Sequence, residues 1–382
     1  MRILLVTPSY YPIIGGSEAL TRSLSDKLSQ IGFHVNIMTL NMNEKWNTSW
    51  KEETRKEGSI NVLRVPALNP FPHLPNPLVT LFRMNVLPKP TFLSKLKNYD
   101  IVHFIGEADL SFPILSYFVK KPKIMHCVGI FRNGGIYQYY MFKRPYLKRV
   151  FKRFFPNLAN VFVAYSSEEK KLLSDLSVPL NKIIILPLGV DVKSLQGNKK
   201  EKIDNLILFV ARIDRIKGLH ILLNALSHLK TPTQLAIIGP KWDGKYYEEI
   251  EQMSRAINEK GFHNVKLLGP MDHNNLTRWY QKAAILVTPY LYETYSYVTL
   301  EALACGTPVV STGSHIFKNC SDGILVTPKD PRRLAEAIET LLVDKELREN
   351  YGKKGIRFVE KYFSWESVIN RLVNVYKHLL SN

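Results

Sequence analysis

Cysteine, acidic residues and long apolar runs are scarce in this chain of 382 residues, and each scarcity excludes a class of protein. The cysteines Cys127, Cys305 and Cys320 are odd in number and lack the spacing of zinc ligands, so neither a disulfide framework nor a zinc module is expected. No apolar run reaches the roughly 18 residues that a membrane-spanning helix requires. The N-terminal segment MRILLVTPSYYP has neither the length nor the cleavage site of a signal peptide. These absences predict a cytoplasmic protein.

Acidic residues are missing altogether between Asp109 and Glu168, an interval that contains ten basic residues. The whole chain has a net charge of +19, and residues 1–190 hold 25 Lys and Arg against 12 Asp and Glu. Charge this one-sided attracts the phosphates of nucleic acids, anionic lipids or nucleotides. A partner that carries phosphate is therefore expected.

Short strands rich in β-branched residues alternate with helical patterns along the whole chain. The predicted strands are Ile3–Val6, Val35–Thr39, Val62–Val65, Ile101–Phe104, Lys123–Val128, Val161–Ala164, Ile183–Leu186, Leu206–Val210, Leu235–Ile238, Val265–Leu268, Ile285–Thr288, Pro308–Ser311 and Ile324–Val326. Such alternation predicts an α/β protein with doubly wound parallel sheets. We predict two Rossmann-like domains facing a cleft, residues 1–190 and 205–363, joined by the polar linker 191–204. Residues 364–382 are predicted to form a final helix with Ser364 as its N-cap.

The stretch LVTPYLYETYSYVTLEALACGTPVV holds two glutamates that follow a predicted strand. Glu293 lies just beyond the apolar run 284–287, and Glu301 opens a segment that is predicted to be helical. A strand, a polar loop and a helix N-terminus form an anion site at the carboxyl edge of a parallel sheet. A carboxylate there would repel a phosphate but can accept hydrogen bonds from sugar hydroxyls. The pair therefore suggests a nucleotide-sugar, and the alternative is a Glu301 that merely complements the helix dipole.

Two further loops join a strand end to groups suited to phosphate. Gly15 and Gly16 precede a helix, where glycines allow the backbone to approach a ligand and the helix start offers free N–H groups. Arg212 and Lys217 follow the strand LILFV, and two cations at one strand end favour a diphosphate nearby. The simpler alternatives are an ordinary turn and a solvated basic loop. His126 ends the strand KIMH, where the alternative to a site residue is a hydrogen-bonded structural histidine.

Taken together, these blocks resemble the retaining glycosyltransferases of the GT-B fold, in particular glycosyltransferase family 4. The resemblance spans nearly the whole chain: the GG pair near the start, GVD at residues 189–191, R-x4-K, E-x7-E and the final FSW helix. The sequence departs from the family at Thr294 and Ser296, where small residues are usual. It also departs at Tyr290, where serine is common, and at Leu188, where asparagine is usual.

The resemblance implies transfer of a hexosyl group from a nucleoside-diphosphate donor to a hydroxyl acceptor, with retention of anomeric configuration. No bound cofactor is implied and no metal is expected, and the chain contains no Asp-x-Asp pair, which disfavours metal-dependent transferases of the other common fold. The implied catalytic residues are His126, which faces the donor sugar in the family, and Glu293, which holds it. The implied donor-binding residues are Gly15, Gly16, Arg212, Lys217, Thr294, Tyr295, Ser296, Tyr297 and Glu301. In the family the residue that matches Glu301 holds the ribose, and the final helix packs on the N-terminal domain.

A basic and aromatic segment, FKRPYLKRVFKRFF, bears on the acceptor. At about 100° per residue, Lys148, Arg149, Lys152 and Arg153 fall opposite the apolar side chains, as in an amphipathic helix. One interpretation is a core helix with a solvated back, and the other is a helix that lies on an anionic membrane. The second predicts a lipid-linked or membrane-presented glycan as acceptor and a protein peripheral on the cytosolic membrane face.

Two alternative functions stay open at this point. Another GT-B enzyme that acts on nucleotide-sugars, such as an epimerase, would share the donor site. A nucleic-acid-binding protein would explain the charge, but the chain has no aromatic RNA-binding motif, zinc spacing or recognition-helix pattern, so no nucleic-acid partner is expected.

Overall fold

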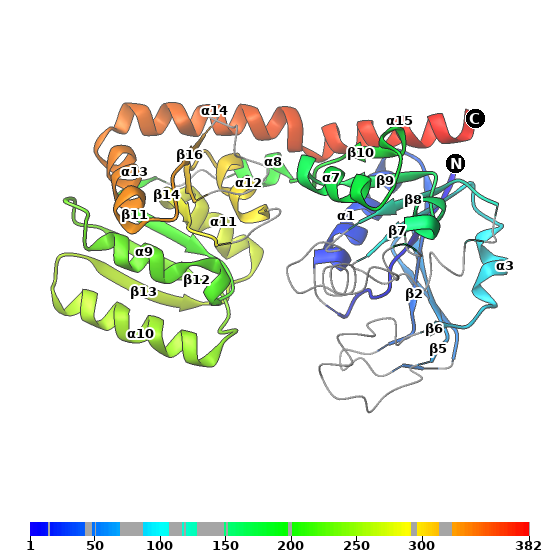
Figure 1. Ribbon diagram of the computed structural model, residues 1–382, viewed down its shortest axis with the longest axis horizontal. Coiled ribbons are helices and arrows are strands. Elements are labelled where there is room, and N and C mark those ends of the chain that lie inside the picture. The colour runs from blue at the N-terminus through cyan, green and yellow to red at the C-terminus, as the bar shows by residue number, and fades with distance from the viewer. Residues whose placement is uncertain are drawn as a thin grey trace. The chain divides into compact units, whose positions relative to one another are not determined.

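The computed structural model divides into two compact units (Figure 1). It describes residues 1–13, 16–42, 48–49, 51–68, 87–106, 117, 120–127, 149, 152–197, 201–291, 296–312 and 323–381. The first unit is Met1–Pro187 together with Ile369–Asn382, and the second is Leu188–Val368. Each unit is built on a largely parallel sheet joined by helices, which confirms the α/β class predicted from the sequence.

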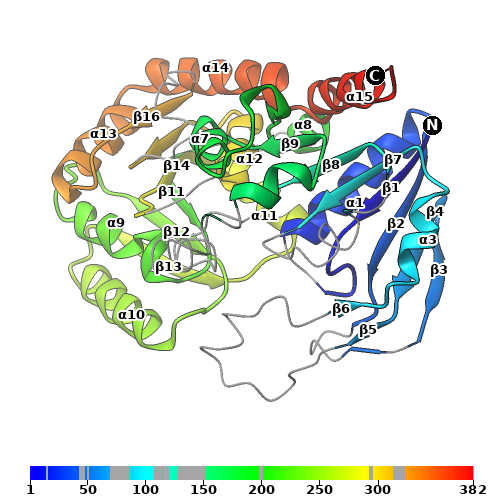
Figure 2. The same cartoon turned by 45° about the vertical axis from the view of Figure 1, so that its right-hand side comes forward.

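The first unit contains one large mixed sheet (Figure 2). Its described strands lie in the order β10-β9-β8-β7-β1-β2-β4-β3, and neighbours are parallel except for β3 with β4. The strands are β1 Arg2–Val6, β2 His34–Leu40, β3 Glu53–Glu57, β4 Ile60–Val65, β7 Ile101–Ile105, β8 Lys123–His126, β9 Val161–Ala164 and β10 Ile183–Ile185, and a separate antiparallel pair is β5 Ala67–Leu68 with β6 Leu87–Pro88. The helices are α1 Gly16–Gln30, α3 Phe92–Leu96 and α7 Ser167–Asp175, with 3-10 turns at Phe155–Asn157 and Leu180–Lys182.

The second unit has a sheet whose described strands are all parallel, in the order β13-β12-β11-β14-β15-β16. Its strands are β11 Ile203–Val210, β12 Gln234–Ile238, β13 Asn264–Gly269, β14 Ala283–Thr288, β15 Val309–Ser311 and β16 Ile324–Val326. Its helices are α8 Val192–Gln196, α9 Leu219–Leu226, α10 Gly244–Glu259, α11 His273–Lys282, α12 Tyr297–Ala304, α13 Pro331–Val343 and α14 Lys345–Phe363, with a 3-10 turn at Arg215–Lys217. The final helix, α15 Trp365–Ser381, begins in this unit and belongs to the first unit from Ile369 onward.

Alternate residues of β11 point to opposite faces of the second sheet, and both faces are buried. Ile207 and Phe209 pack in a cluster with side chains of α9, α10 and α13. Leu206, Leu208 and Val210 pack in a second cluster with side chains of α8, α11 and α12. Because helices cover both faces, such strands are continuous apolar runs in the sequence, which is why they were predictable.

In both sheets the first strand is central. The next strands are added on one side of it, and the later strands are added on the other side. The central strand β1 lies between β2 and β7, and β11 lies between β12 and β14. Ligands of α/β proteins bind at such a switch point, beyond the carboxyl ends of the strands. In the first unit the backbone is tightly packed there, since a Cβ on Gly106 would lie 2.8 Å from the ring of Pro8.

The final helix buries one of its faces and begins at the predicted cap. Leu372 and Tyr376 are fully buried, and the hydroxyl of Ser364 accepts a hydrogen bond from the N–H of Ser367 at 3.2 Å, which confirms Ser364 as a cap. Just before α8, Gly189 leaves room for Trp365, because a Cβ at this glycine would lie 2.5 Å from the indole ring.

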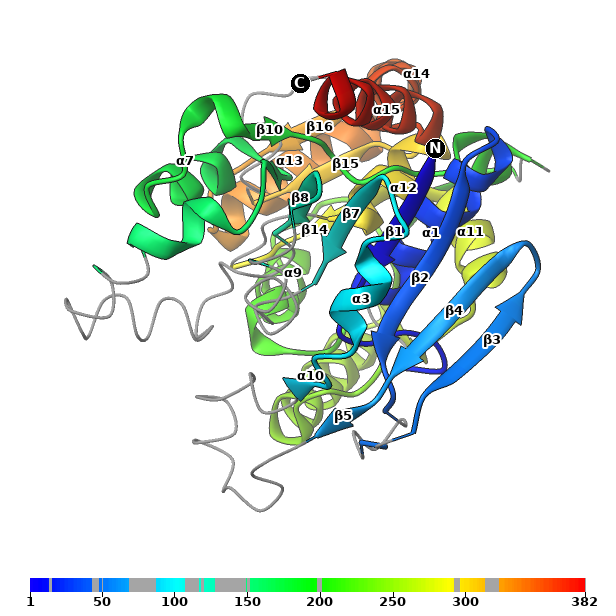
Figure 3. The same cartoon turned by 90° about the vertical axis from the view of Figure 1, so that its right-hand side faces the viewer.

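Several segments differ from the sequence-based expectation, among them the two-residue strands β5 and β6, which were not predicted. Strand β3 was not predicted, because its residues ETRKE are charged and mostly exposed. Among the described strands it pairs with β4 alone, at the edge of the sheet (Figure 3). The polar stretch 191–204, predicted to be a linker, contains helix α8 and the start of β11. Asp191 caps α8 by accepting from the N–H of Ser194 at 3.1 Å, and Val192 and Leu195 are buried in the second unit. Two apolar residues in a short helix were too few to show in the sequence pattern.

Candidate functional site

Arg212 and Lys217 lie in the loop that follows β11, at the switch point of the second sheet. The loop passes through the 3-10 turn Arg215–Lys217 before α9 begins. Asp214 caps this turn, since its carboxylate accepts a hydrogen bond from the N–H of Ile216 at 3.2 Å. The sequence thus places both cations on a short, capped loop.

The end of β14 holds the same loop in place. Gly218 has a φ of +65°, and a Cβ there would lie 1.9 Å from the carbonyl oxygen of Pro289, so any other residue would push the two segments apart. The N–H of Leu291 also donates to the carbonyl of Ile216 at 2.9 Å. The loop is therefore fixed against the neighbouring strand end.

Aromatic rings hold the two cations. The guanidinium carbon of Arg212 lies 4.2 Å from the ring centroid of Trp242, and Nζ of Lys217 lies 4.4 Å from that of Tyr290. Arg212 is also 4.0 Å from the carboxylate of Asp214, at the outer limit of an ion pair. Aromatic faces attract cations without cancelling their charge, so the loop keeps a positive field that suits an anion. Sequence reasoning missed Trp242 and Tyr290 as partners, because no local pattern links them to this loop.

Helix α12 begins at Tyr297, one turn earlier than predicted. Ser296 is its N-cap, with its hydroxyl accepting from the N–H of Thr299 at 3.3 Å. The prediction that Glu301 opens the helix is wrong, because the residues Tyr-Val-Thr that precede it have modest helix propensity and hid the true start. Glu301 lies in the second turn, so complementing the helix dipole does not explain it.

The carboxylate of Glu301 has a partner on each oxygen. The hydroxyl of Tyr280 donates to Oε2 at 2.9 Å, and Nε2 of His273 lies 3.4 Å from Oε1. Burial raises the pKa of Glu301, while His273 and Tyr280 oppose this rise by favouring the charged form. The side chain is 16% exposed, and each oxygen can accept a further hydrogen bond. Sequence reasoning missed both partners, although their seven-residue spacing on α11 puts them on one helix face.

The structure describes only some of the other predicted site residues. Glu293, Thr294, Tyr295 and Gly15 lie outside the described residues. Gly16 is the first residue of α1. The first turn of this helix also contains Glu18, which is buried and accepts hydrogen bonds from the hydroxyls of Ser9 and Ser17. This carboxylate, which was not predicted, complements the helix start from within the fold.

His126 lies at the end of β8 in the first unit and is 2% exposed. Its Nδ1 is 2.9 Å from Nε2 of His103 on β7, and Nδ1 of His103 is 2.7 Å from the hydroxyl of Tyr376 on α15. Burial lowers the pKa of His126 to about 3, and it holds the pKa of His103 well below 6.5. Both rings are therefore neutral. The sequence pointed to His126, but it could not show Tyr376, which is far away along the chain.

The predicted basic helix is described only in part. Lys148 lies outside the described residues, Arg149 and Arg153 are exposed, and Lys152 is half-buried. The next residue, Phe154, is partly buried and packs against a hydrophobic cluster of the first unit.

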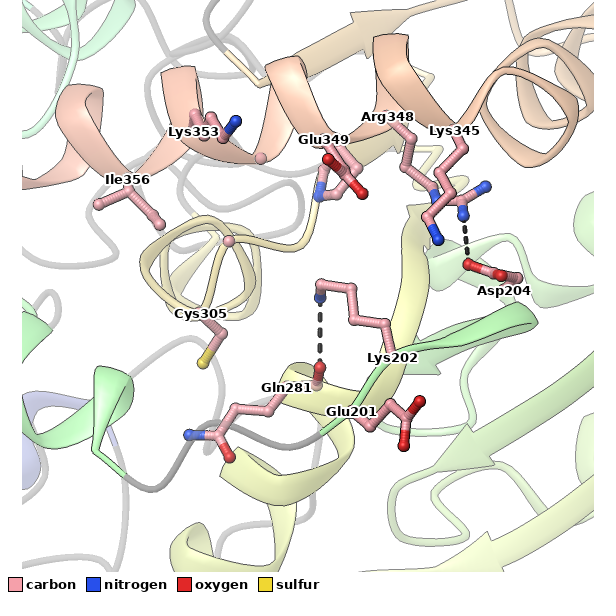
Figure 4. Close-up of a pocket in the computed structure, with 13 residues that line it drawn as sticks. Glu201, Lys202, Asp204, Gln281, Cys305, Lys345, Arg348, Glu349, Lys353 and Ile356 are labelled. Atoms are coloured by element: carbon pink, nitrogen blue, oxygen red, sulfur yellow. Dashed lines mark hydrogen bonds and ion pairs between the residues drawn. The ribbon is translucent and has the colours of Figure 1, made fainter.

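A cavity of about 430 Å³ lies in the second unit (Figure 4). Asp204 at the start of β11 and Pro308 just before β15 line it, so it lies at the amino ends of the strands, the edge opposite Arg212 and Lys217. Its two most buried cations are already satisfied. Nζ of Lys202 donates to the carbonyls of Gln281 at 3.2 Å and Ala283 at 3.0 Å and to the hydroxyl of Thr307 at 2.6 Å. Arg348 pairs with Asp204 and also donates to the carbonyls of Leu341 and Leu342. The bonds of Arg348 tie α14 to β11 and α13, and those of Lys202 join the residue before β11 to neighbouring elements of the same edge, so we do not place the donor here.

Within the described ranges, no group of three or more His, Cys, Asp and Glu side chains could hold a metal ion. In the same part of the chain, no helix is long and apolar enough to cross a membrane.

Two protein families match the chain, each over slightly less than half of its length. The family described as Glycosyltransferase Family 4 matches residues 14–194, and the family described as Glycosyl transferases group 1 matches residues 192–358. Together they take in the strand-end loops of both units. The chain therefore belongs to glycosyltransferase family 4.

A known relative and two solved structures are similar to this chain over nearly its full length. The chain is 26% identical to an uncharacterized glycosyltransferase of Methanocaldococcus jannaschii, over 99% of this chain and 98% of the relative. Sucrose-phosphate synthase from Thermosynechococcus elongatus has a similar structure, with a TM-score of 0.73, 21% identity, and coverage of 100% of this chain and 99% of that one. HepE from Anabaena, solved in complex with UDP, has a TM-score of 0.73 at 16% identity, with coverage of 99% and 100%. The predicted GT-B fold is confirmed.

Proposed function

We propose that this glycosyltransferase moves a hexosyl group from a nucleoside-diphosphate donor to a hydroxyl acceptor, with retention of anomeric configuration. The observation that carries the proposal is the pair Arg212 and Lys217 at the switch point of the second sheet, each against an aromatic ring. Two such cations on one fixed loop suit a diphosphate. The UDP complex of HepE, which shares the fold, supports a nucleoside diphosphate as the donor's leaving group.

In the proposed reaction the bond between the sugar's anomeric carbon and the diphosphate oxygen breaks. The departing diphosphate gains negative charge, which Arg212, Lys217 and the N–H groups at the start of α1 stabilise. The acceptor hydroxyl attacks from the face that the diphosphate leaves, and its proton passes to a departing phosphate oxygen. Retention follows because both events take place on one face of the sugar. No metal or bound cofactor takes part in this scheme.

Around the donor, Glu301 is proposed to accept hydrogen bonds from the ribose hydroxyls. Tyr280 and His273 hold its two oxygens in place and leave room for further donors. Ser296 and Tyr297, at the start of α12, are proposed to lie beside the donor.

The family resemblance supports roles for four more residues that the structure does not describe. Glu293 is proposed to hold the donor sugar, Thr294 and Tyr295 to contact the donor, and Gly15 to lie near the diphosphate. His126 is proposed to contact the donor sugar from the first unit. Its neutral ring suits a hydrogen bond to a sugar oxygen.

The acceptor is proposed to be lipid-linked or presented at a membrane, with the protein bound to the anionic cytosolic face. The support is the interval between Asp109 and Glu168, which has ten basic residues and no acid. Among those that the structure describes, Lys120, Arg149 and Arg153 are exposed. Such a surface attracts anionic headgroups.

Thermal-shift measurement against UDP-, GDP- and ADP-sugars tests the donor. One nucleotide class should raise the melting temperature, because a ligand that binds the folded state stabilises it. Turnover of that donor should then require an added acceptor. Conversion of the sugar without an acceptor would identify an epimerase instead. Salt-sensitive binding of polyanions with no response to any nucleotide-sugar would contradict the donor proposal and favour a nucleic-acid partner.

A further inference from the structure

Three buried side chains from three separate elements form a line that ends at His126. The hydroxyl of Tyr376, on α15, lies 2.7 Å from Nδ1 of His103, on β7. Nε2 of His103 lies 2.9 Å from Nδ1 of His126, on β8. The two imidazole planes are nearly parallel, differing by 13°, and their centroids are 5.0 Å apart. The 2.9 Å between the two nitrogens is shorter than the van der Waals contact of stacked rings, so the rings meet through these nitrogens in a hydrogen bond.

The burial of Tyr376 decides which way the hydrogens point. Its side chain is 0% exposed, and among the described residues its hydroxyl bonds only to His103. If the hydroxyl accepted from His103, its own hydrogen would be left without a partner inside the protein, which is unfavourable. The hydroxyl therefore donates to Nδ1 of His103, which must carry its hydrogen on Nε2. That hydrogen is donated to Nδ1 of His126, so His126 also carries its hydrogen on Nε2.

The chain of bonds requires both rings to be neutral. Nδ1 of His103 and Nδ1 of His126 both act as acceptors, so a proton added to either would set one donor against another. Burial disfavours such a proton and lowers the pKa of both histidines. Burial and the hydrogen-bonding pattern therefore both favour neutral rings.

We propose that Tyr376 is a positioning residue which, through His103, fixes the tautomer of His126 so that its Nε2–H donates a hydrogen bond to an oxygen of the donor sugar. This inference rests on the proposed function, in which His126 contacts the donor. A ring fixed in this state cannot take a proton from the acceptor at Nε2, because that nitrogen has no free lone pair. The acceptor's proton must go elsewhere, in agreement with its proposed transfer to the departing phosphate.

Tyr376→Phe tests the inference, since it keeps the ring and removes only the hydroxyl. In the wild type, nitrogen-15 NMR of histidine-labelled protein should show His126 with a protonated Nε2 and an unprotonated Nδ1. In the variant His103 is no longer held, and a second tautomer of His126 should appear. The ratio kcat/KM for the nucleotide-sugar should fall roughly three- to ten-fold, the effect of weakening one hydrogen bond.

Substitutions of His103 separate positioning from packing. His103→Gln offers a carbonyl oxygen that can accept from Tyr376 and an N–H that can donate to His126, so it should keep the tautomer and most of the activity. His103→Leu fills the space but breaks the row of hydrogen bonds, so it should have the same effect on the His126 tautomer and on kcat/KM as Tyr376→Phe. Leu372→Ala is the control for stability alone, because Leu372 is buried on the same helix as Tyr376 but takes no part in the row of hydrogen bonds. It should lower the melting temperature and leave the tautomer unchanged.

Two results would overturn the inference. One is an unchanged His126 tautomer in Tyr376→Phe, and the other is a changed tautomer with an unchanged kcat/KM. The NMR measurement needs no substrate. A wild-type protein that turns over no nucleotide-sugar would therefore contradict the proposed function while the tautomer test still decides on the chain of hydrogen bonds. A folded variant is verified by its circular dichroism before either measurement.

Discussion

Lys217 is the residue on which the donor site depends most directly. Replacing it with Ala removes a charge-assisted contact to a phosphate, which should cost about 1.5–3 kcal/mol of nucleotide-sugar affinity. Calorimetric titration measures this loss. Arg215→Ala is a matched control in the same turn, because Arg215 is exposed and pairs with Glu249. The affinity of Arg215→Ala for the nucleotide-sugar should stay near that of the wild type. Normal donor binding by Lys217→Ala would contradict the phosphate assignment.

Glu301 distinguishes a ribose contact from a structural role. Glu301→Gln keeps an oxygen that can accept from Tyr280 but loses the charge that strengthens bonds from ribose hydroxyls. Nucleotide affinity should fall by about 1 kcal/mol, the difference between a charged and a neutral acceptor. Stability should stay the same or rise slightly, because burial already disfavours the charged carboxylate. A large loss of melting temperature with unchanged affinity would assign Glu301 to the fold alone.

At the scale of elements, the turn between β11 and α9 should tolerate no side chain at Gly218. Gly218→Ala combines a left-handed φ with a Cβ that would lie 1.9 Å from the carbonyl of Pro289, so the loop that carries Lys217 must move. Gly261→Ala is the control, with a φ of +71° and nothing within 4 Å of its Cβ. The control should cost roughly 1–2 kcal/mol of stability, the penalty for left-handed backbone. Gly218→Ala should cost clearly more in chemical denaturation and also weaken donor binding, whereas equal effects would contradict the packing argument.

The elements that the sequence predicted are those whose signal is local. Strands such as β11 are covered on both faces, so their apolar runs are visible without any knowledge of the fold. The edge strand β3 and the short helix α8 carry weak local signals and were missed. The start of α12 depends on the capping hydroxyl of Ser296, which one Ser in a polar loop does not reveal.

The residues of the candidate site also differ in how far the sequence could predict them. Arg212, Lys217 and His126 are found at strand ends, where position alone suggests a role. Their partners are distant in the chain: Trp242 lies in the loop between β12 and α10, and Tyr376 lies on α15. Contacts of this kind depend on the tertiary structure.

For the whole molecule, the two buried histidines should make stability fall in mild acid. Well above pH 6.5 they are neutral in the folded and unfolded chain and contribute no pH dependence. Below it the unfolded chain takes up protons that the folded protein refuses, because the pKa of His126 is lowered to about 3 and that of His103 well below 6.5. Each histidine then removes about 1.4 kcal/mol of stability per pH unit.

Comparison of the wild type with His126→Gln isolates this effect. Glu169 acts in the opposite direction, since burial raises its pKa to about 7 and favours the folded state as the pH falls towards 4.5. It is present in both proteins, so its contribution cancels. Urea denaturation between pH 6.5 and pH 5 should give a slope against pH that is shallower in the variant, by a difference that approaches about 1.4 kcal/mol per unit near pH 5. Identical slopes would mean that His126 is charged in the folded protein.

The charge of the whole molecule is uneven, and the membrane proposal depends on that unevenness. Attraction to headgroups acts over only about 8–10 Å at physiological salt, so the basic surface must lie against the bilayer. Neutralising Lys148, Arg149, Lys152 and Arg153 should weaken binding to anionic liposomes at least several-fold, at roughly 1 kcal/mol for each charge near the surface. Co-sedimentation measures the binding, which should also weaken as salt is raised, and donor affinity should not change.

A second set of four substitutions tests whether position or net charge matters. Lys245, Arg255, Lys260 and Lys266 are exposed on α10, just beyond its end and on β13 of the second unit, and neutralising them removes the same charge. If the basic segment binds the membrane, this control should bind liposomes nearly as well as the wild type. Equal losses in both sets would mean that net charge alone drives binding. A wild-type protein that ignores anionic liposomes at low salt, and glycosylates a soluble acceptor freely, would contradict the membrane proposal and leave the transferase itself intact.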